Sequence, residues 1–177
     1  MYRLIQGKCS QLASGSHSAG RVLLAQALAP APVPEIVPGP HGKPAFVSGT
    51  GLWFNISHSG DEIALLLSDE GEVGCDIEVI RPRKNLQQIV DSVFSHAEQQ
   101  AFANATDPLT LFWQIWTRKE AMLKQAGGSV WQIAEYDSYA PRPLFLQHAI
   151  LPGKCALAIC TPTPPANAIF NTSAARI

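Results

Sequence analysis

The sequence has no excess of either charge and no long apolar run. Its 13 Lys and Arg residues nearly balance its 14 Asp and Glu residues, which gives a formal net charge of -1. Proteins that bind nucleic acid through its phosphates are strongly basic, so nucleic acid is not an expected partner. The densest apolar runs, residues 22–28 and 63–67, are much shorter than the roughly 20 residues that span a bilayer. The first residues also lack the apolar core of a secretion signal, so we expect a soluble, cytoplasmic protein with no membrane partner.

Cysteine is scarce too, and its spacing argues against a zinc site or a disulfide framework. No C-x-x-C pair occurs, and the cysteines lie mostly among apolar residues, which favours buried, reduced thiols. They are Cys9, Cys75, Cys155 and Cys160. The 177 residues, 46% of them hydrophobic, can form a real core, since a chain of this size buries about 70% of its unfolded surface. We therefore expect one compact domain over residues 1–177.

Apolar periodicity and turn residues predict a mixture of helices and strands. Ser95 followed by Glu98 predicts a capping box, Asp107 before Pro108 predicts the start of a long helix, and Gly127 predicts its end. The expected helices are residues 16–28, 86–94, 96–104 and 108–126. The expected strands are residues 46–47, 53–59, 62–68, 73–80, 144–150 and 155–161.

Three other segments are expected to lack regular structure. Residues 30–44 contain six prolines and predict an irregular surface segment. Residues 69–71 predict a hairpin turn that joins the strand before them to the strand after them. The tail from residue 162, which is rich in Pro, Thr and Ser, is expected to be irregular.

Two short patterns carry the chemistry. Asp76 and Glu78 lie two apart on a strand rich in β-branched residues, so both should point to one face while Ile77 points into the core. Glu120 and Lys124 lie one turn apart on the long helix. Either pattern alone is common on protein surfaces, but carboxylates in such apolar surroundings need a partner. Three carboxylates beside an ammonium group suit a magnesium ion that is bound together with a phosphate.

Five blocks between residues 42 and 128 resemble, in order, the motifs of the 4'-phosphopantetheinyl transferases of the surfactin-synthetase-activating type. They are residues 42–46 (GKPAF), 54–59 (FNISHS), 74–78 (GCDIE), 94–98 (FSHAE) and 113–124 (WQIWTRKEAMLK). The resemblance implies transfer of the 4'-phosphopantetheine arm of coenzyme A to a serine of an apo acyl or peptidyl carrier protein. The products are the holo carrier and adenosine 3',5'-bisphosphate, which is the reaction of a holo-[acyl-carrier-protein] synthase.

The resemblance also implies a fold and a set of site residues. The fold is α+β, with two similar halves, about residues 1–73 and 74–177, related by a pseudo-twofold axis with the active site at their junction, in a monomeric protein. Asp76, Glu78 and Glu120 are the implied Mg²⁺ ligands, and Lys124 is the implied catalytic contact to the phosphates. The proton acceptor for the carrier serine is either Glu120 or a metal-bound water, because a bound cation makes a carboxylate a weaker base.

Coenzyme A is expected to contact Lys43, Pro44, Ser57, His58 and Lys124. The segment before residue 42 is short for this type of transferase, and the basic residues for the 3'-phosphate are expected there. The candidates are Arg3, Lys8, His17 and Arg21, of which Arg21 is favoured because it projects from a helix.

The carrier protein is expected to meet a basic cluster formed by Arg81, Arg83 and Lys84, because such carriers are acidic and opposite charges steer association. A solvated turn is the alternative interpretation of this cluster.

Two other functions fit the same residues. One is a magnesium-dependent nucleotide phosphohydrolase, and the other is a non-catalytic relic that only binds carrier proteins. The sequence leaves open whether the carrier serves fatty acid, polyketide or nonribosomal peptide synthesis.

Overall fold

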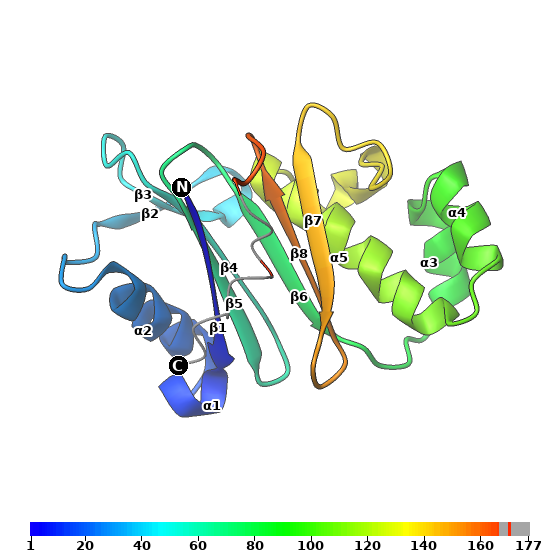
Figure 1. Cartoon of the computed structure of the whole chain (residues 1–177), viewed down its shortest axis with the longest axis horizontal. Helices are drawn as coiled ribbons and strands as arrows, with labels where there is room; N and C mark the ends of the chain where they lie inside the picture. The colour runs from blue at the N-terminus through cyan, green and yellow to red at the C-terminus, as the bar shows by residue number, and fades with distance from the viewer. Residues whose placement is uncertain (167–169, 171–177) are drawn as a thin grey trace.

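The computed structural model describes residues 1–166 and residue 170, except for the side chain of Pro40. The fold is α+β, with two three-stranded antiparallel sheets side by side (Figure 1). The first sheet has the order β1–β5–β4 and the second the order β6–β8–β7. Their strands are β1 (Tyr2–Lys8), β4 (Trp53–Ser59), β5 (Glu62–Ser68), β6 (Gly74–Val79), β7 (Phe145–Leu151) and β8 (Cys155–Thr161).

Helix α2 (Ser16–Leu28) packs on β1 and β5 of the first sheet and follows the short helix α1 (Cys9–Leu12). Its bounds are those predicted from the sequence. Leu23 and Leu24 face the sheet and are almost completely buried against a core that includes Phe54 and Leu65. This packing fixes one face of β4 against α2 and leaves the other side chains of β4 free to meet the second sheet.

The segment between α2 and β4 is more regular than expected. Strand β2 (Ile36–Pro38) pairs with β3 (Pro44–Phe46) around a 3₁₀ turn at Pro40–Gly42. The expectation of an irregular segment is therefore wrong for residues 36–38, and the strand expected at residues 46–47 begins two residues earlier. Proline is tolerated here because a two-stranded ribbon has only edge strands, where a missing N–H breaks no ladder.

The second sheet is covered by α5 (Pro108–Ala126), which packs on β6, β7 and β8. Both predicted ends of α5 are confirmed: the Asp107 side chain accepts a hydrogen bond from the Thr110 amide, and Gly127 adopts φ 64°. Before α5 lie α3 (Leu86–Val93) and α4 (His96–Ala103). The predicted capping box between Ser95 and Glu98 is present at the start of α4.

One predicted connection is wrong. Residues 69–71 do not form a hairpin turn, because β5 pairs with β1 and β4 whereas β6 pairs with β8 in the other sheet. The chain crosses between the sheets at this point. Strand β1 and the 3₁₀ helix η2 (Val130–Glu135) were not predicted either, since neither segment has a clear apolar period.

The remaining expectations concern the thiols and the tail. All four cysteines are free and buried, as predicted. Residues 162–166 contain no helix or strand, and the rest of the expected irregular tail, residues 167–169 and 171–177, lies outside the described residues. Within the described chain, no helix has both the length and the apolar character needed to cross a membrane.

Candidate active site

Strands β4 and β6 meet at the boundary between the two sheets, where side-chain oxygens of β4, in place of backbone carbonyls, accept from the amides of β6. Every second residue of β4 offers a side-chain oxygen to every second amide of β6, because alternate side chains of a strand share a face. The oxygen-to-nitrogen pairs are Asn55 Oδ1 with Cys75 N (2.7 Å), Ser57 Oγ with Ile77 N (3.2 Å) and Ser59 Oγ with Val79 N (3.2 Å).

Gly74 sets the distance between β6 and α5. A Cβ atom at this position would lie 2.0 Å from the carbonyl oxygen of Ala121 and 2.5 Å from the amide nitrogen of Gln125. Only a residue without a side chain therefore allows the strand and the helix to approach so closely. The close approach brings Asp76 of β6 beside Lys124 of α5.

Asp76 is buried, and its two carboxylate oxygens have different surroundings. Oδ1 accepts hydrogen bonds from Ser57 Oγ at 2.8 Å and from Lys124 Nζ at 2.6 Å. Oδ2 is buried and has no hydrogen-bond partner within the described part of the chain. A buried carboxylate oxygen without a partner is unusual, and its chemistry suits a bound cation or another donor.

Glu78 and Glu120 are half-buried near Asp76. Burial raises the pKa of Glu78, its hydrogen bond from Ser59 opposes that rise, and the negative charge of Asp76 adds to it. Burial likewise raises the pKa of Glu120, and the charges of Asp76 and Glu78 raise it further while Lys124 opposes them. The strand and the helix thus bring the three predicted carboxylates close enough to repel one another.

These carboxylates are not close enough together to form a complete metal site. Among the described residues, no group of three or more His, Cys, Asp or Glu side chains is arranged to hold a metal ion. Lys124 is instead the cation that contacts Asp76. Burial works to lower the pKa of Lys124, but the charge of Asp76 and its hydrogen bond outweigh burial and leave that pKa raised. Lys124 therefore remains an ammonium group at neutral pH.

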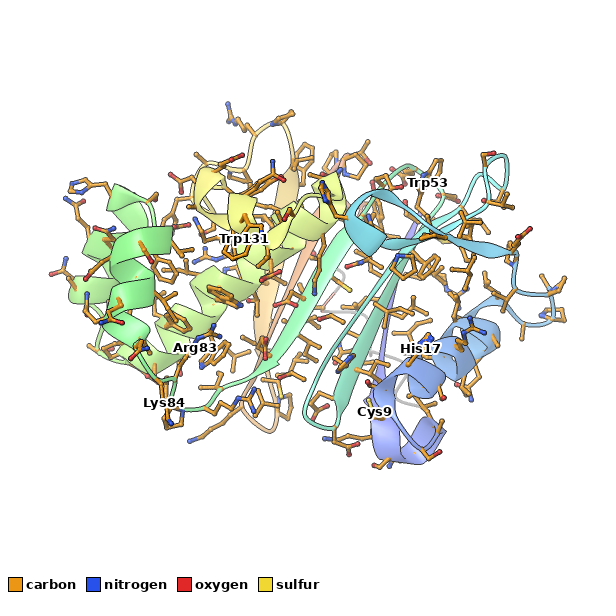
Figure 2. The ribbon with its side chains drawn as sticks, turned by 180° about the vertical axis from the view of Figure 1, so that it is seen from behind. Cys9, His17, Trp53, Arg83, Lys84 and Trp131 are labelled. Atoms are coloured by element: carbon orange, nitrogen blue, oxygen red, sulfur yellow. The ribbon has the colours of Figure 1, made fainter. Side chains whose placement is uncertain are left out.

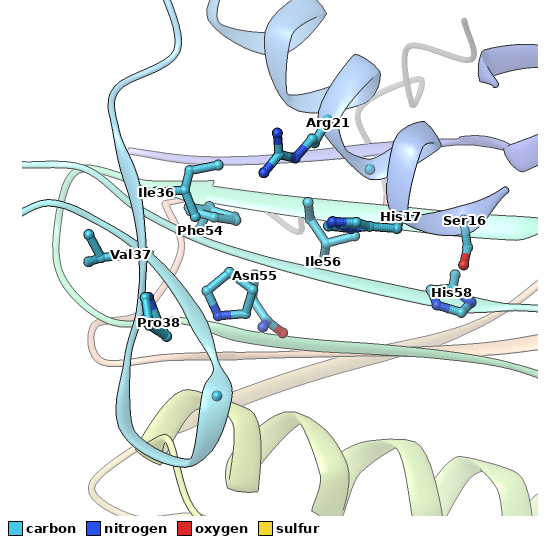
Figure 3. A pocket seen from close by; sticks show the side chains of 13 residues that line it. Ser16, His17, Arg21, Ile36, Val37, Pro38, Phe54, Asn55, Ile56 and His58 are labelled. Carbon is cyan, nitrogen blue, oxygen red and sulfur yellow. The ribbon is translucent and has the colours of Figure 1, made fainter. Parts of the chain in front are cut away.

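A pocket of about 400 Å³ opens on the other side of β4, between α2 and the β2–β3 ribbon (Figure 3). Three of the predicted coenzyme A contacts, Arg21, Pro44 and His58, line it, and His17 and Ser16 lie at the same end as His58. Its mixture of apolar walls with Arg and His side chains suits a ligand that carries both an aromatic ring and phosphate groups.

The other predicted coenzyme A contacts lie elsewhere. Ser57 and Lys124 are at the Asp76 carboxylate. Lys43 is turned away from the pocket and donates to Glu72 at 2.5 Å and to the carbonyl of Val73 at 3.0 Å.

Two of the four basic candidates for the 3'-phosphate are engaged outside the pocket. Arg3 donates to the carbonyl of Ala27 on α2, and Lys8 pairs with Glu62 at the far end of the first sheet. His17 and Arg21 line the pocket.

Comparison with known proteins identifies relatives of this chain. Residues 72–143 match the family described as the 4'-phosphopantetheinyl transferase superfamily. The 4'-phosphopantetheinyl transferase AcpT of Salmonella typhi is 52% identical over 93% of this chain and 94% of its own length. AcpT of Escherichia coli (strain K12) is 50% identical over 93% of this chain and 92% of its own length. The chain belongs to the 4'-phosphopantetheinyl transferase family.

The basic cluster of this transferase lies at the α3 end of the second sheet, on the opposite side of the molecule from His17 (Figure 2). Arg81 and Lys84 are exposed. Arg83 is half-buried, and its guanidinium carbon lies 4.6 Å from the ring centre of Trp116. Arg83 lowers the pKa of Glu120 and Arg81 that of Glu78, although in both cases burial outweighs the effect. Two residues of the cluster, Arg81 and Arg83, therefore lie near enough to the carboxylates of the transferase to affect their pKa values.

Sequence reasoning missed a buried ion pair behind the site. Glu98 and Lys119 are both completely buried, and Lys119 Nζ lies 3.0 Å from Glu98 Oε2. Glu98 also accepts from the amides of Ser95 and Ser138, and Lys119 donates to the carbonyl of Tyr136. The pair ties α4 and the segment after η2 to the helix of the transferase that carries Glu120 and Lys124. The sequence identified Glu98 as part of a capping box and Lys119 as the neighbour of Glu120, but it gave no sign that the two residues pair.

Proposed function

We propose that this transferase moves the 4'-phosphopantetheine arm of coenzyme A to a serine hydroxyl of an apo carrier protein, at the junction of β4, β6 and α5. The observation that carries the proposal is the contact between Asp76 and Lys124 beside two further carboxylates. Transfer from a pyrophosphate ester needs positive charge beside the bond that breaks. A fixed ammonium group supplies part of that charge, and the carboxylates can bind a cation that supplies the rest.

A divalent cation, Mg²⁺ in our proposal, fits the residues present. The buried Oδ2 of Asp76 lacks a partner, and Glu78 and Glu120 have raised pKa values because they are buried near other negative charges. Asp76, Glu78 and Glu120 would hold the ion, with the pyrophosphate of coenzyme A supplying further oxygens. Such an ion neutralises the carboxylates and the developing charge on the phosphates.

Lys124 and Glu120 act on the reacting groups. The carrier serine oxygen forms a bond to the phosphorus that bears the pantetheine arm, and the bond from that phosphorus to the bridging oxygen breaks. Adenosine 3',5'-bisphosphate leaves. Lys124, whose side chain is partly exposed beside Asp76, stabilises the charge that gathers on the phosphates. Either Glu120 or a water held by the cation would accept the serine proton, because the cation would oppose the rise that burial causes in the pKa of Glu120.

The nucleotide end of coenzyme A is proposed to occupy the pocket between α2 and β4. Arg21 and His58 face the pocket and would bind the 3'-phosphate, while Pro44 forms part of the wall. Asn55 lines the same pocket and also accepts a hydrogen bond from Cys75 on β6, so the pocket and the carboxylates share one strand. A ligand that reaches over β4 can thus contact both. Lys43 would join the nucleotide contacts only if it left Glu72.

We also propose that the chain consists of two similar halves, residues 1–73 and 74–177, related by a pseudo-twofold axis, as in the surfactin-synthetase-activating type. In support, each three-stranded sheet has its first strand at one edge, its last strand in the centre and its middle strand at the other edge. Each sheet is also covered by one long helix that precedes its middle strand. With both halves in one chain, the site needs no second copy, and we propose a monomer.

Arg81 and Lys84 are proposed to steer an acidic carrier protein toward the site, while Arg83 is held over Trp116, close enough to Glu120 to lower its pKa. Replacement of the two exposed residues, Arg81 and Lys84, by Glu should slow transfer to the carrier and remove most of its dependence on salt. The KM for coenzyme A should change little. Salt dependence equal to that of the unmodified protein would exclude these residues from carrier binding.

One assay tests the proposed function against its two alternatives. The protein is incubated with coenzyme A, Mg²⁺ and an apo carrier protein, and the carrier is weighed by mass spectrometry. A gain of one phosphopantetheine group supports transfer. Consumption of coenzyme A without a carrier would indicate a phosphohydrolase, and carrier binding without modification would indicate a non-catalytic protein. Lys124→Met, which keeps the length of the side chain but not its charge, is the matched inactive control.

A further inference from the structure

Ser57 and Ser59 each touch β6 twice. Ser57 Oγ accepts from the amide of Ile77 and lies 2.8 Å from Asp76 Oδ1. Ser59 Oγ accepts from the amide of Val79 and lies 2.5 Å from Glu78 Oε2. Each serine therefore binds the backbone of β6 at one residue and the carboxylate of the residue before it.

The direction of these bonds follows from the number of protons. A serine hydroxyl has one proton to donate and two lone pairs to accept with. The amide of Ile77 and the ammonium group of Lys124 both contact Ser57 Oγ, and Lys124 Nζ lies 3.1 Å from it. Both groups can only donate, so each takes one lone pair of the hydroxyl. The single proton of Ser57 must therefore point to Asp76. For Ser59 the amide of Val79 takes a lone pair, and the proton points to Glu78.

These bonds divide each carboxylate into one engaged oxygen and one available oxygen. Oδ1 of Asp76 receives Ser57 and Lys124, whereas Oδ2 is buried and lacks a hydrogen-bond partner in the described chain. Oε2 of Glu78 receives Ser59, and Oε1 receives no hydrogen bond from any described residue. Neither carboxylate is free to turn, because each serine is itself anchored to the backbone of β6.

We propose that Ser57 and Ser59 are positioning residues that each commit one oxygen of Asp76 or Glu78 to a hydrogen bond, so that the site offers single oxygens to a cation and thereby favours Mg²⁺ over Ca²⁺. This inference rests on the proposed function, because it assigns the two serines a role in the same cation site.

The preference follows from the coordination habits of the two ions. Mg²⁺ takes about six oxygens at about 2.0–2.1 Å and is usually bound through one or two carboxylates with phosphate and water. Ca²⁺ takes about 6–8 oxygens at about 2.3–2.6 Å and often binds both oxygens of one carboxylate. Oδ1 of Asp76 uses its two lone pairs for Ser57 and Lys124, and Oε2 of Glu78 uses one for Ser59. Each held oxygen is therefore a poorer second ligand for one ion than the other oxygen of the same carboxylate. The serine bonds therefore penalise the larger ion.

A purely structural role for the serines makes a different prediction. Asn55 joins β4 to β6 in the same way as the serines but contacts no carboxylate, so Asn55→Ala weakens the junction and leaves Asp76 and Glu78 as they are. Ser68→Ala removes another buried hydroxyl, whose bond is to the turn amide of Glu70. Both variants control for the loss of a polar group without a change at the carboxylates.

The test measures ion binding and not activity. Mn²⁺ binding to the protein with coenzyme A, in the absence of any carrier, is followed by electron paramagnetic resonance, and Mg²⁺ or Ca²⁺ is added to displace it. In Ser59→Ala, and in Ser59→Cys, which keeps the size of the side chain, the ratio of the Ca²⁺ to the Mg²⁺ displacement midpoint should fall on the order of 10-fold. Ser59→Thr, which keeps the hydroxyl, should retain the wild-type ratio, as should the two control variants.

Each outcome decides a separate point. A lowered ratio in both hydroxyl-free variants, with the wild-type ratio in Ser59→Thr, supports the inference. An unchanged ratio in Ser59→Ala and Ser59→Cys, with Mn²⁺ still bound, overturns the inference and leaves the cation site of the proposed function intact. Mn²⁺ binding by Asp76→Asn that equals binding by the wild type would overturn the cation site itself.

Discussion

Lys124 donates a hydrogen bond to Oδ1 of Asp76 at 2.6 Å, and it leaves Oδ2 of the same carboxylate buried without a partner among the described residues. The ammonium group therefore balances the charge of Asp76, and together with Ser57 it satisfies only one of the two carboxylate oxygens. Glu78 and Glu120 lie close enough to Asp76 for its charge to raise their pKa values. The protein thus holds more negative charge at this junction than its own cation compensates.

Replacement of Glu120 by Gln should abolish transfer and leave a folded protein. The amide keeps the size of the side chain but can neither accept the serine proton nor hold a cation by charge, and loss of acid–base catalysis alone costs about 10²–10⁴-fold in rate. Transfer rates measured by mass spectrometry, with circular dichroism to show folding, check the prediction. Glu135→Gln, the same exchange at an exposed side chain of η2, is a control that should keep activity. Normal turnover by Glu120→Gln would exclude Glu120 both as proton acceptor and as cation ligand.

The same variant should be more stable than the wild type when no divalent cation is present. Burial and neighbouring charges raise the pKa of Glu120 in the folded protein, so the folded state holds its proton at pH values where the unfolded chain has lost it. Wild-type stability therefore falls as the pH rises from the ordinary carboxyl pKa, about 4.3, through the raised folded value. Glu120→Gln lacks this loss.

Thermal unfolding in a chelating buffer at several pH values measures the effect. The midpoint of Glu120→Gln should exceed that of the wild type at neutral pH, and the difference should vanish below about pH 4, where the carboxyl is neutral in both states. A difference that is independent of pH would mean that ionisation of Glu120 does not destabilise the fold. Addition of Mg²⁺ and coenzyme A should stabilise the wild type more than the variant, because a ligand that binds only the folded state raises its stability.

Gly74→Ala should separate β6 from α5 and impair both stability and transfer. The added methyl group would lie 2.0 Å from the Ala121 carbonyl, and backbone atoms cannot give way as flexible side chains do. Overpacking of this kind typically costs about 1–3 kcal/mol, and each kcal/mol lowers the melting temperature of a domain of this size by about 2–4 °C. Gly7→Ala is the matched control, since Gly7 also lies in a strand but its Cβ would meet only ordinary contacts at 3.6 and 3.8 Å. Equal melting temperatures for the two variants would contradict this account.

Local signals allowed much of the fold to be predicted. The bounds of α2 and α5 are correct because caps and stops, such as Asp107 and Gly127, act through adjacent residues. The bounds of β4 and β5 are correct because Gly60 and Asp61 interrupt a clear apolar pattern. The shared face of Asp76 and Glu78, with Ile77 buried, follows from the period of a strand alone.

The parts that were missed depend on contacts between distant segments. The position of β6 beside β4 is fixed by Ser57 and Ser59, whose spacing becomes meaningful only when the two strands are already adjacent. In the same way, the contact of Lys43 with Glu72, far along the chain, could not be predicted from the sequence. The pairing of Glu98 with Lys119 likewise joins two helices that sequence periodicity treats separately.

Lys119→Met should destabilise the protein strongly, although Lys119 lies next to Glu120 in sequence. The change leaves Glu98 buried without its cation, and removal of one partner from a buried ion pair costs about 3–5 kcal/mol. Chemical unfolding measures this loss. Lys8→Met is the matched control, because Lys8 and Glu62 form a partly exposed pair that contributes little. Similar unfolding midpoints for the two variants would show that the buried pair does not hold α4 against α5.

Arg21→Met should weaken binding of coenzyme A through its 3'-phosphate. Arg21 lines the pocket between α2 and the β2–β3 ribbon, and the methionine keeps its apolar stem while removing the charged group. The variant should raise the KM for coenzyme A on the order of 10-fold, since a hydrogen bond to a charged group contributes about 1.5–3 kcal/mol. It should leave kcat nearly unchanged, because the pocket lies on the other side of β4 from Lys124 and Asp76.

With 3'-dephospho-coenzyme A, which lacks the group that Arg21 is proposed to bind, the wild type and the variant should have equal KM values. Arg3→Met, at a side chain that binds the Ala27 carbonyl instead, should behave as the wild type with both substrates. An equal rise in KM for both substrates would assign Arg21 to the shape of the pocket and not to the 3'-phosphate.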